Sequence, residues 1–318
     1  MKGYQFEDTQ GTFHLKKAEN ISYLYFPIAG EAGLKSSLTP NLGGDAKIDQ
    51  NTFLLEPVSA ENLVNNRNSR NFWCNVKGIG SWSLTGNAAE ALSKKFTEMQ
   101  DDSEVTAGFM WQKTTRESKK YQLRGEILSF IPVEKNVEVM LVTITNTGRM
   151  AQTVTPTAAI PLYGRSADNI RDHRHVTSLL HRIETTDIGV LVTPTLSFDE
   201  RGHQVNHMTY YCVGWSGNGE KPVDFYPTAE DFVGEGGNFE RPYAIVKNAE
   251  GVKAGTRIEG LEAVGGLHFS EITLEPEEEC SYLIFTGITE DIQEIRNLSK
   301  TYTTREKVLE ELEKTKAY

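Results

Sequence analysis

Alternating hydrophobic and polar positions run through the middle of the chain and predict β-strands. In 137–145 (VEVMLVTIT), the odd-numbered residues from Val137 to Thr143 lie on one face, and the even-numbered residues from Glu138 to Ile144 lie on the other. Residues 134–136 predict a short hairpin connection before this strand. Further strands are predicted over 104–115, 121–133, 153–162, 176–184, 189–196, 208–215, 267–274 and 280–288. Strands of this length, separated by Gly, Pro and Asn, predict a mainly β fold, a large antiparallel β-sandwich.

Helical periodicity is confined to two places. Residues 88–100 place Leu92, Phe96 and Met99 on one helical face. The tail, 290–316, predicts two amphipathic helices, the second with Thr303 as N-cap and Glu306 completing a capping box. These helices either fold back on the sheet or lead into a helical domain outside this chain, and we favour the second interpretation.

Composition narrows the class of protein. Among 318 residues, 33 basic and 44 acidic side chains give a net charge of −11. Such a chain repels phosphate backbones and anionic lipids, so we expect neither nucleic acid nor membrane partners. The three cysteines are far apart and lack a CxxC pair, which argues against a disulfide scaffold or zinc site. With no signal-peptide pattern and no long apolar run, we expect a cytoplasmic protein.

The densest group of chemically active side chains lies in 164–182 (GRSADNIRDHRHVTSLLHR). Such a run is either a solvated or internally paired loop, or a loop that offers donors to a polyhydroxylated or anionic ligand. Arg suits the second role because its fork can bond vicinal hydroxyls or phosphate in a bidentate way. His173 and His175 would share one face of a strand, but no third metal ligand is placed, so we expect no metal.

Two further segments carry aromatic, acidic and glycine residues. Residues 224–242 are either a structured surface loop or a loop that reaches a sugar or a neighbouring domain. Phe72, Trp73 and Trp82 could form a stacking platform, although we favour a place in the core. No P-loop, dinucleotide-binding fingerprint or Gly-x-Ser-x-Gly elbow is present, so no cofactor is expected.

Three segments resemble one known family. RNFWCNVKGIGSWSLTG (70–86), YGRSADNIRDHRHVTSLLHR (163–182) and PTAEDFVGEGGNFERP (227–242) are similar to the N-terminal region of glycoside hydrolase family 94. That family includes cellobiose, chitobiose, laminaribiose and β-1,2-oligoglucan phosphorylases and the cyclic β-1,2-glucan synthases. The resemblance runs from about Glu56 to the end of the chain, and the middle segment is the most specific.

The resemblance implies a galactose-mutarotase-like supersandwich over 1–288 and linker helices over 289–318, followed in the family by an (α/α)6 catalytic barrel. It implies an inverting phosphorylase that converts a β-gluco-oligosaccharide and inorganic phosphate, its co-substrate, to α-glucose 1-phosphate. Members are commonly homodimers. The family's general acid and phosphate site belong to the barrel, so we expect the chain to stop before them, as a truncated frame, an excised domain or a split subunit.

No catalytic residue is therefore assigned to this chain, and whether it is an enzyme by itself stays open. The residues that match the family's charged loop are expected to shape a substrate cleft or a subunit interface: Arg165, Asp168, Asn169, Asp172, His173 and Arg174. The leading hypothesis is a carbohydrate-binding and assembly domain, whose partners are a gluco-oligosaccharide and either a second copy or a catalytic barrel. The alternatives are a freestanding aldose epimerase, with His173 or His175 and a distant Glu as acid and base, and a ligand-free interaction module.

Overall fold

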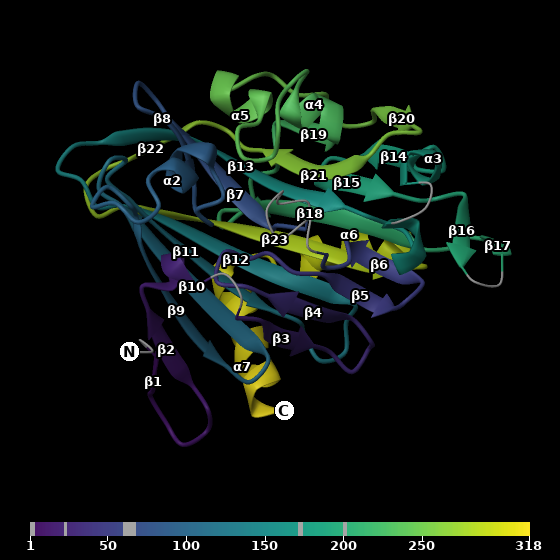
Figure 1. Ribbon diagram of the computed structural model, residues 1–318, viewed down its shortest axis with the longest axis horizontal. Coiled ribbons are helices and arrows are strands. Elements are labelled where there is room, and N and C mark those ends of the chain that lie inside the picture. The colour runs from purple at the N-terminus through teal and green to yellow at the C-terminus, as the bar shows by residue number, and fades with distance from the viewer. Residues whose placement is uncertain (1–3, 22–23, 60–67, 171–173, 200–201) are drawn as a thin grey trace.

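The computed structural model describes residues 4–21, 24–59, 68–170, 174–199 and 202–318. Within these residues, strands form two large and two small sheets, and long helices occur at the C-terminal end (Figure 1). Neighbouring strands pair antiparallel in both large sheets. The predicted mainly β, antiparallel supersandwich is confirmed.

The largest sheet has eleven strands in the described part of the chain and forms the base of the fold. In spatial order they are β1 (Tyr4–Phe6), β2 (Phe13–Lys16), β9 (Asp102–Gly108), β10 (Trp111–Ser118), β11 (Leu123–Phe130), β12 (Val137–Asn146), β23 (Glu279–Thr289), β18 (Thr209–Ser216), β15 (Gly189–Val192), β14 (Arg182–Thr185) and β20 (Arg257–Glu259). The central strands are buried along their length, as the ten buried residues of β12 show, because both of their faces are covered.

The second large sheet covers one face of the first. It contains β19 (Asp224–Thr228), β21 (Ala263–His268), β13 (Gln152–Leu162), β7 (Asn71–Val76) and β8 (Gly80–Ser83), with β22 (Ile272–Leu274) beside β13. Phe72 and Ile160 from this sheet share one buried cluster with Val142 and Ile284 from the first. This cluster is the main hydrophobic core.

Two small sheets complete the strands. A four-stranded sheet, β3 (Phe26–Ala29), β4 (Lys35–Leu38), β5 (Ala46–Asp49) and β6 (Thr52–Leu55), contributes Ile28 and Leu38 to the main core. A hairpin of β16 (Leu196–Asp199) and β17 (Gly202–Val205) projects from the right of Figure 1.

Most helices are single turns on the connections. They are η1 (Ala18–Asn20), α2 (Ala89–Ser93), η2 (Ala167–Ile170), α3 (Arg174–Ser178), α4 (Ala229–Val233) and α5 (Tyr243–Lys247). The two longer helices are α6 (Ile292–Thr301) and α7 (Arg305–Ala317). Among the described residues, no helix combines the length and the apolar character that crossing a bilayer would need.

Helices α6 and α7 pack on the outer face of the eleven-stranded sheet, behind it in Figure 1. Leu298, Val308 and Leu312 are buried in one cluster with Phe130 and Phe285 of the sheet. The side chain of Trp215 on β18 donates its Nε1–H to the carbonyl of Tyr302, between the two helices (3.0 Å). Both helices therefore cover the sandwich; that they also lead to a further domain stays a prediction, as does the boundary at 288.

The alternation in β12 divides its residues between two cores, as predicted. Val137, Val139 and Leu141 face the cluster under α6 and α7, whereas Met140 and Val142 face the main core. The structure also confirms that the three aromatic side chains considered for a stacking platform lie in the core. Phe72, Trp73 and Trp82 are 0%, 1% and 2% exposed.

Several predicted elements are wrong in extent. The helix predicted over 88–100 is only α2, because Phe96 and Met99, 81% and 67% exposed, gain little burial that would favour continuing it. The strand predicted over 104–115 is a hairpin of β9 and β10, which turns at Met110 with a positive φ of 62°. Residues 176–184 begin in α3 and become extended only at Arg182. The N-cap of α7 is Thr304, one residue later than predicted.

Candidate functional site

The charged loop, residues 164–182, follows β13, where the chain turns away from the sheet. After β13, the chain runs beside β6. Tyr163 donates its backbone N–H to the carbonyl of Leu54 (2.8 Å), and the carbonyl of Arg165 accepts the backbone N–H of Phe53 (3.0 Å). Between them, Gly164 has a φ of 60°, a conformation that glycine adopts without steric cost. The four-stranded sheet thus fixes the start of the loop and directs the side chain of Arg165 inward.

Arg165 is buried and holds the loop to the sandwich. Its guanidinium makes a forked ion pair with both carboxylate oxygens of Glu262, at the start of β21. It also donates to the carbonyl of Tyr163 (2.9 Å) and to the hydroxyl of Thr177 (3.1 Å). The guanidinium carbon lies 4.5 Å from the centre of the Tyr163 ring. These contacts satisfy the charge inside the protein, so Arg165 acts here as a positioning residue.

His181 lies in the same buried environment. Burial, and secondly the positive charge of Arg165, lower the pKa of His181 to about 4. Its Nδ1 lies 3.2 Å from the carbonyl of Leu261, next to Glu262. The ring is therefore neutral at physiological pH.

The other matched residues have different surroundings. Asn169 is buried and accepts a hydrogen bond from the hydroxyl of Ser166 (3.1 Å), which closes η2 on itself. Asp168, one residue earlier, is exposed to solvent. Arg174 is the first residue of α3. Asp172 and His173 lie outside the described residues, so the role of the six as a cleft or interface stays a prediction.

Sequence reasoning missed Glu262, the carboxylate that pairs with Arg165. It is 97 positions away along the chain, and an acidic residue between Leu261 and Ala263 carries no signal of its partner. Only the antiparallel pairing of β13 with β21 brings the two segments together. The carboxylate that compensates a buried arginine can be identified only when the fold is known.

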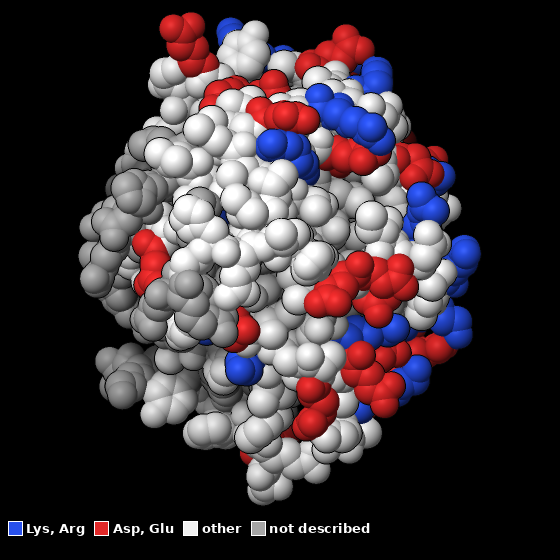
Figure 2. Space-filling view, turned by 90° about the vertical axis from the view of Figure 1, so that its right-hand side faces the viewer, with Lys and Arg blue, Asp and Glu red and all other residues white. Residues whose placement is uncertain are grey.

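Exposed apolar side chains lie near this loop. Val176 and Leu179 near α3, and Val205 on β17, are 54%, 58% and 64% exposed. Figure 2 looks at this side of the molecule and shows charged side chains along its borders, with uncharged atoms over much of the middle. Exposed apolar side chains beside a positioned polar loop are typical of a surface that meets a ligand or a protein. Among the described residues, no three His, Cys, Asp or Glu side chains form a group that could hold a metal ion.

Comparison with known families identifies the domain. A family model described as "Glycosyl hydrolase 94, supersandwich domain" matches residues 56–305, more than half of the chain. The chain belongs to this family. The match includes the charged loop, the whole second large sheet, the eleven-stranded sheet apart from β1 and β2, and α6, so the resemblance found from the three sequence segments is confirmed. A search of curated proteins finds no match.

Solved structures with similar folds are distant from this supersandwich domain. A proposed aldose 1-epimerase from Escherichia coli K12 is 10% identical, with a TM-score of 0.42, over 84% of this chain and 99% of the other. A bacterial glucoamylase complexed with acarbose is 9% identical, with a TM-score of 0.40, over 98% of this chain. A proposed kojibiose phosphorylase from the human microbiome is 8% identical, with a TM-score of 0.40, over 95% of this chain. The supersandwich domain spans 36% of each of the last two chains.

Proposed function

We propose that this supersandwich domain is the carbohydrate-binding and assembly domain of an inverting β-glucoside phosphorylase. In the parent reaction, inorganic phosphate cleaves the terminal β-glucosidic bond of a β-gluco-oligosaccharide and yields α-glucose 1-phosphate and the saccharide shortened by one glucose unit. The family match over residues 56–305 carries this proposal. In an inverting reaction, a carboxylic acid protonates the leaving oxygen while the nucleophile attacks the opposite face of the sugar. We assign both the acid and the phosphate site to a helical catalytic domain, and no bond chemistry to this chain.

The charged loop supports a role at the substrate. The ion pair between Arg165 and Glu262 fixes the start of the loop, so Asp168, three residues later, is presented without a large ordering cost on binding. Among the described residues of the matched set, Asp168 is the exposed carboxylate, and its oxygens can accept hydrogen bonds from sugar hydroxyls. The buried Arg165 would act through the loop and would not contact the sugar directly.

The uncharged surface supports a role in assembly. Val176, Leu179 and Val205 would lose exposed apolar area if a catalytic barrel or a second copy of the domain covered this side. We propose a homodimer in which this surface approaches a catalytic site. The free, largely buried cysteines and the acidic surface agree with a cytoplasmic location, which we propose together with the absence of a cofactor.

The proposal is tested with the 318-residue chain and an Asp168→Ala variant. Calorimetric titration with β-linked gluco-oligosaccharides should show binding that Asp168→Ala weakens about tenfold, because a charge-assisted hydrogen bond is lost. Asp102→Ala is the matched control, since Asp102 is an exposed carboxylate at the start of β9. The chain alone should release no glucose 1-phosphate when phosphate is added. Phosphorolysis by the chain alone would contradict the proposal, and accelerated mutarotation of α-glucose would support an aldose epimerase instead.

A further inference from the structure

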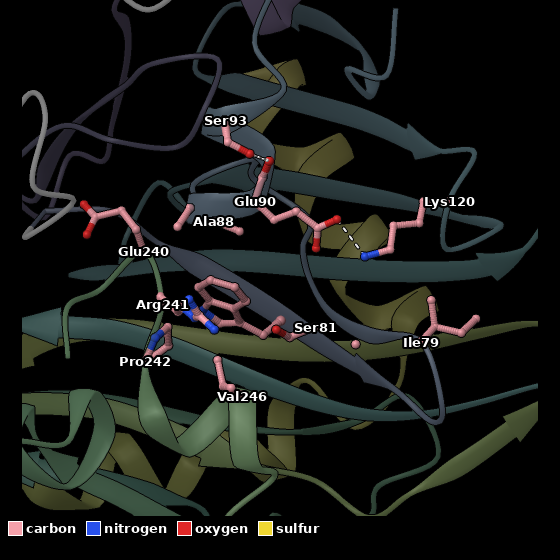
Figure 3. Close-up of a pocket in the computed structure, with 13 residues that line it drawn as sticks. Ile79, Ser81, Ala88, Glu90, Ser93, Lys120, Glu240, Arg241, Pro242 and Val246 are labelled. Atoms are coloured by element: carbon pink, nitrogen blue, oxygen red, sulfur yellow. Dashed lines mark hydrogen bonds and ion pairs between the residues drawn. The ribbon is translucent and has the colours of Figure 1, made fainter. Parts of the chain in front are cut away.

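A hollow lies away from the charged loop, beside the edge strand β8. Its volume is about 450 Å³, within the range of roughly 300–1,000 Å³ that is typical of small-molecule sites. Strand β8, α2 and α5 are on the left and top of Figure 1, whereas α3 and β14 are on the right. Figure 3 shows Glu240, Arg241 and Pro242 on one side of the hollow and Ile79 and Lys120 on the other.

Two of the three segments that resemble the family meet here. Residues 70–86 supply Trp73 and Ser81, and residues 227–242 supply Glu240 and Arg241. The two walls are tied together, because Ala89 at the start of α2 donates its backbone N–H to the carbonyl of Glu240 (2.7 Å). The charged loop described above uses neither segment. The hollow therefore gives a common location to two motifs that the proposed function leaves without a role.

Trp73 carries an unsatisfied polar group at this hollow. The residue lines the hollow and is 1% exposed, yet its Nε1–H has no hydrogen-bond partner among the described residues. By contrast, the indole of Trp82 donates to Asp101 (2.8 Å), and that of Trp215 donates to a backbone carbonyl. Because a buried donor without an acceptor is destabilising, an acceptor such as a buried water is expected at Trp73.

The charges around the hollow are balanced. Burial tends to raise the pKa of Glu90, but hydrogen bonds from Lys120, Lys94 and Tyr121 outweigh it and lower the pKa to about 2. Glu90 is thus an anion paired with cations, and Lys120 reaches it at 2.6 Å (Figure 3). Arg241, which is exposed, stands near Glu240 on the facing wall. A hollow lined by both signs favours a neutral ligand with many hydroxyls over a phosphate or an ammonium ion.

We propose that this hollow is a second carbohydrate-binding site, which holds a neutral saccharide unit remote from the charged loop. Arg241 and Lys120 donate to its hydroxyls, and Glu90 and Glu240 accept from them, while the saccharide lies against the buried indole of Trp73. The aliphatic side chains of Ile79 and Val246 contact the apolar face of the ring. The choice of a saccharide rests on the proposed function, whereas the position of the site rests on the hollow itself.

The test observes each tryptophan separately. The chain has four tryptophans, so a proton–nitrogen spectrum of the ¹⁵N-labelled chain contains four indole signals, and Trp73→Phe assigns the relevant one. Titration with cellobiose, laminaribiose or the β-1,2-linked glucose disaccharide should shift the Trp73 signal in a saturable way. The signals of Trp82 and Trp215 should stay in place, because their N–H groups are already bound.

Substitution of Arg241 then tests whether the wall of the hollow contacts the saccharide. Arg241→Ala should weaken the binding measured at the Trp73 signal at least tenfold. Arg257→Ala, which removes another exposed arginine from β20, should leave it unchanged. Arg241 is exposed, so its substitution is expected to leave the unfolding temperature unchanged, which separates lost binding from lost folding.

Three outcomes would overturn this second site. If disaccharide binds but only Asp168→Ala weakens it, while the Trp73 signal is static, the second site is wrong and the proposed function stands. If no disaccharide binds, both the second site and the carbohydrate-binding part of the proposed function are wrong, and the phosphorolysis assay decides the catalytic part separately. If Arg241→Ala changes the oligomeric state and not the affinity for disaccharide, the hollow is a protein contact.

Discussion

His181 and Arg165 show how one buried residue sets the chemistry of another. The guanidinium is compensated by Glu262, so the buried pair is stable, but its field and the surrounding protein still disfavour a second positive charge. The imidazole is consequently neutral, and its Nδ1 faces a backbone carbonyl. The charged loop is thus held by the buried pair of Arg165 and Glu262, whereas Asp168 is exposed and can make contacts.

We expect stability to depend on pH through His181. The unfolded chain binds a proton near pH 6.5 and the folded chain only near pH 4, so stability is fully present above about pH 6.5 and is lost as the pH falls towards 4. The loss attributable to this group is roughly 3 kcal/mol. Urea unfolding of His181→Gln at several pH values should show a flatter profile than the unsubstituted chain. His207→Gln, at an exposed position, is the control, and identical profiles for His181→Gln and the unsubstituted chain would refute the assignment.

Among the elements, α6 and α7 carry the clearest structural role. Their apolar residues complete a core with Phe130 and Phe285 that the eleven-stranded sheet would otherwise expose. Their outer faces carry lysine–glutamate pairs such as Lys307 with Glu310. The pattern is that of helices bound to a sheet on one side and facing solvent on the other.

Leu312→Ala should therefore destabilise the whole sandwich. The side chain is 4% exposed, and its loss should lower the free energy of unfolding by about 2–4 kcal/mol through lost burial and the remaining cavity. Denaturant titration followed by tryptophan fluorescence measures the change. Glu313→Ala, on the exposed face, should have an effect of about 0.5 kcal/mol or less. If Leu312→Ala left the sheet's transition unchanged, α7 would be an independent linker.

At the scale of the whole molecule, one buried ion pair joins three sheets. Arg70 precedes β7 of the second large sheet, Glu138 lies on β12 of the first, and Ser36 lies on β4 of the four-stranded sheet. Arg70 donates to Glu138 (3.0 Å for Nη2 to Oε2) and to the carbonyl of Gly44 (2.8 Å), and Ser36 donates to the same carboxylate. Satisfying both charges requires all three sheets in register.

Arg70→Met should cost about 3–5 kcal/mol of stability, because it leaves Glu138 charged and without its cation in the interior. Adding Glu138→Gln should recover part of that loss, since a neutral amide is cheaper to bury than an unpaired carboxylate. Thermal and urea unfolding of the single and double variants measures the coupling. Additive losses in the double variant would show that the pair does not join the sheets as described.

Local patterns identified most of the fold. The alternation around Val139 and Met140 located β12 and both its faces, because a strand has a two-residue period whatever packs on it. The charged loop was located from composition and resemblance alone. Within it, the sequence could not separate Arg165, which is buried, from Asp168, which is exposed, because burial depends on a sheet folded elsewhere in the chain.

By itself, then, the sequence determined the β class, the positions of the central strands, the family and the two C-terminal helices, all of which follow from short-range periodicity and local motifs. Tertiary structure alone decided that Glu262 pairs with Arg165, that Arg241 stands across a hollow from Lys120, and that the residues after α2 leave the helix. These outcomes depend on contacts between segments far apart in the chain, and the free energy of such contacts is defined only once antiparallel pairing has brought the segments together.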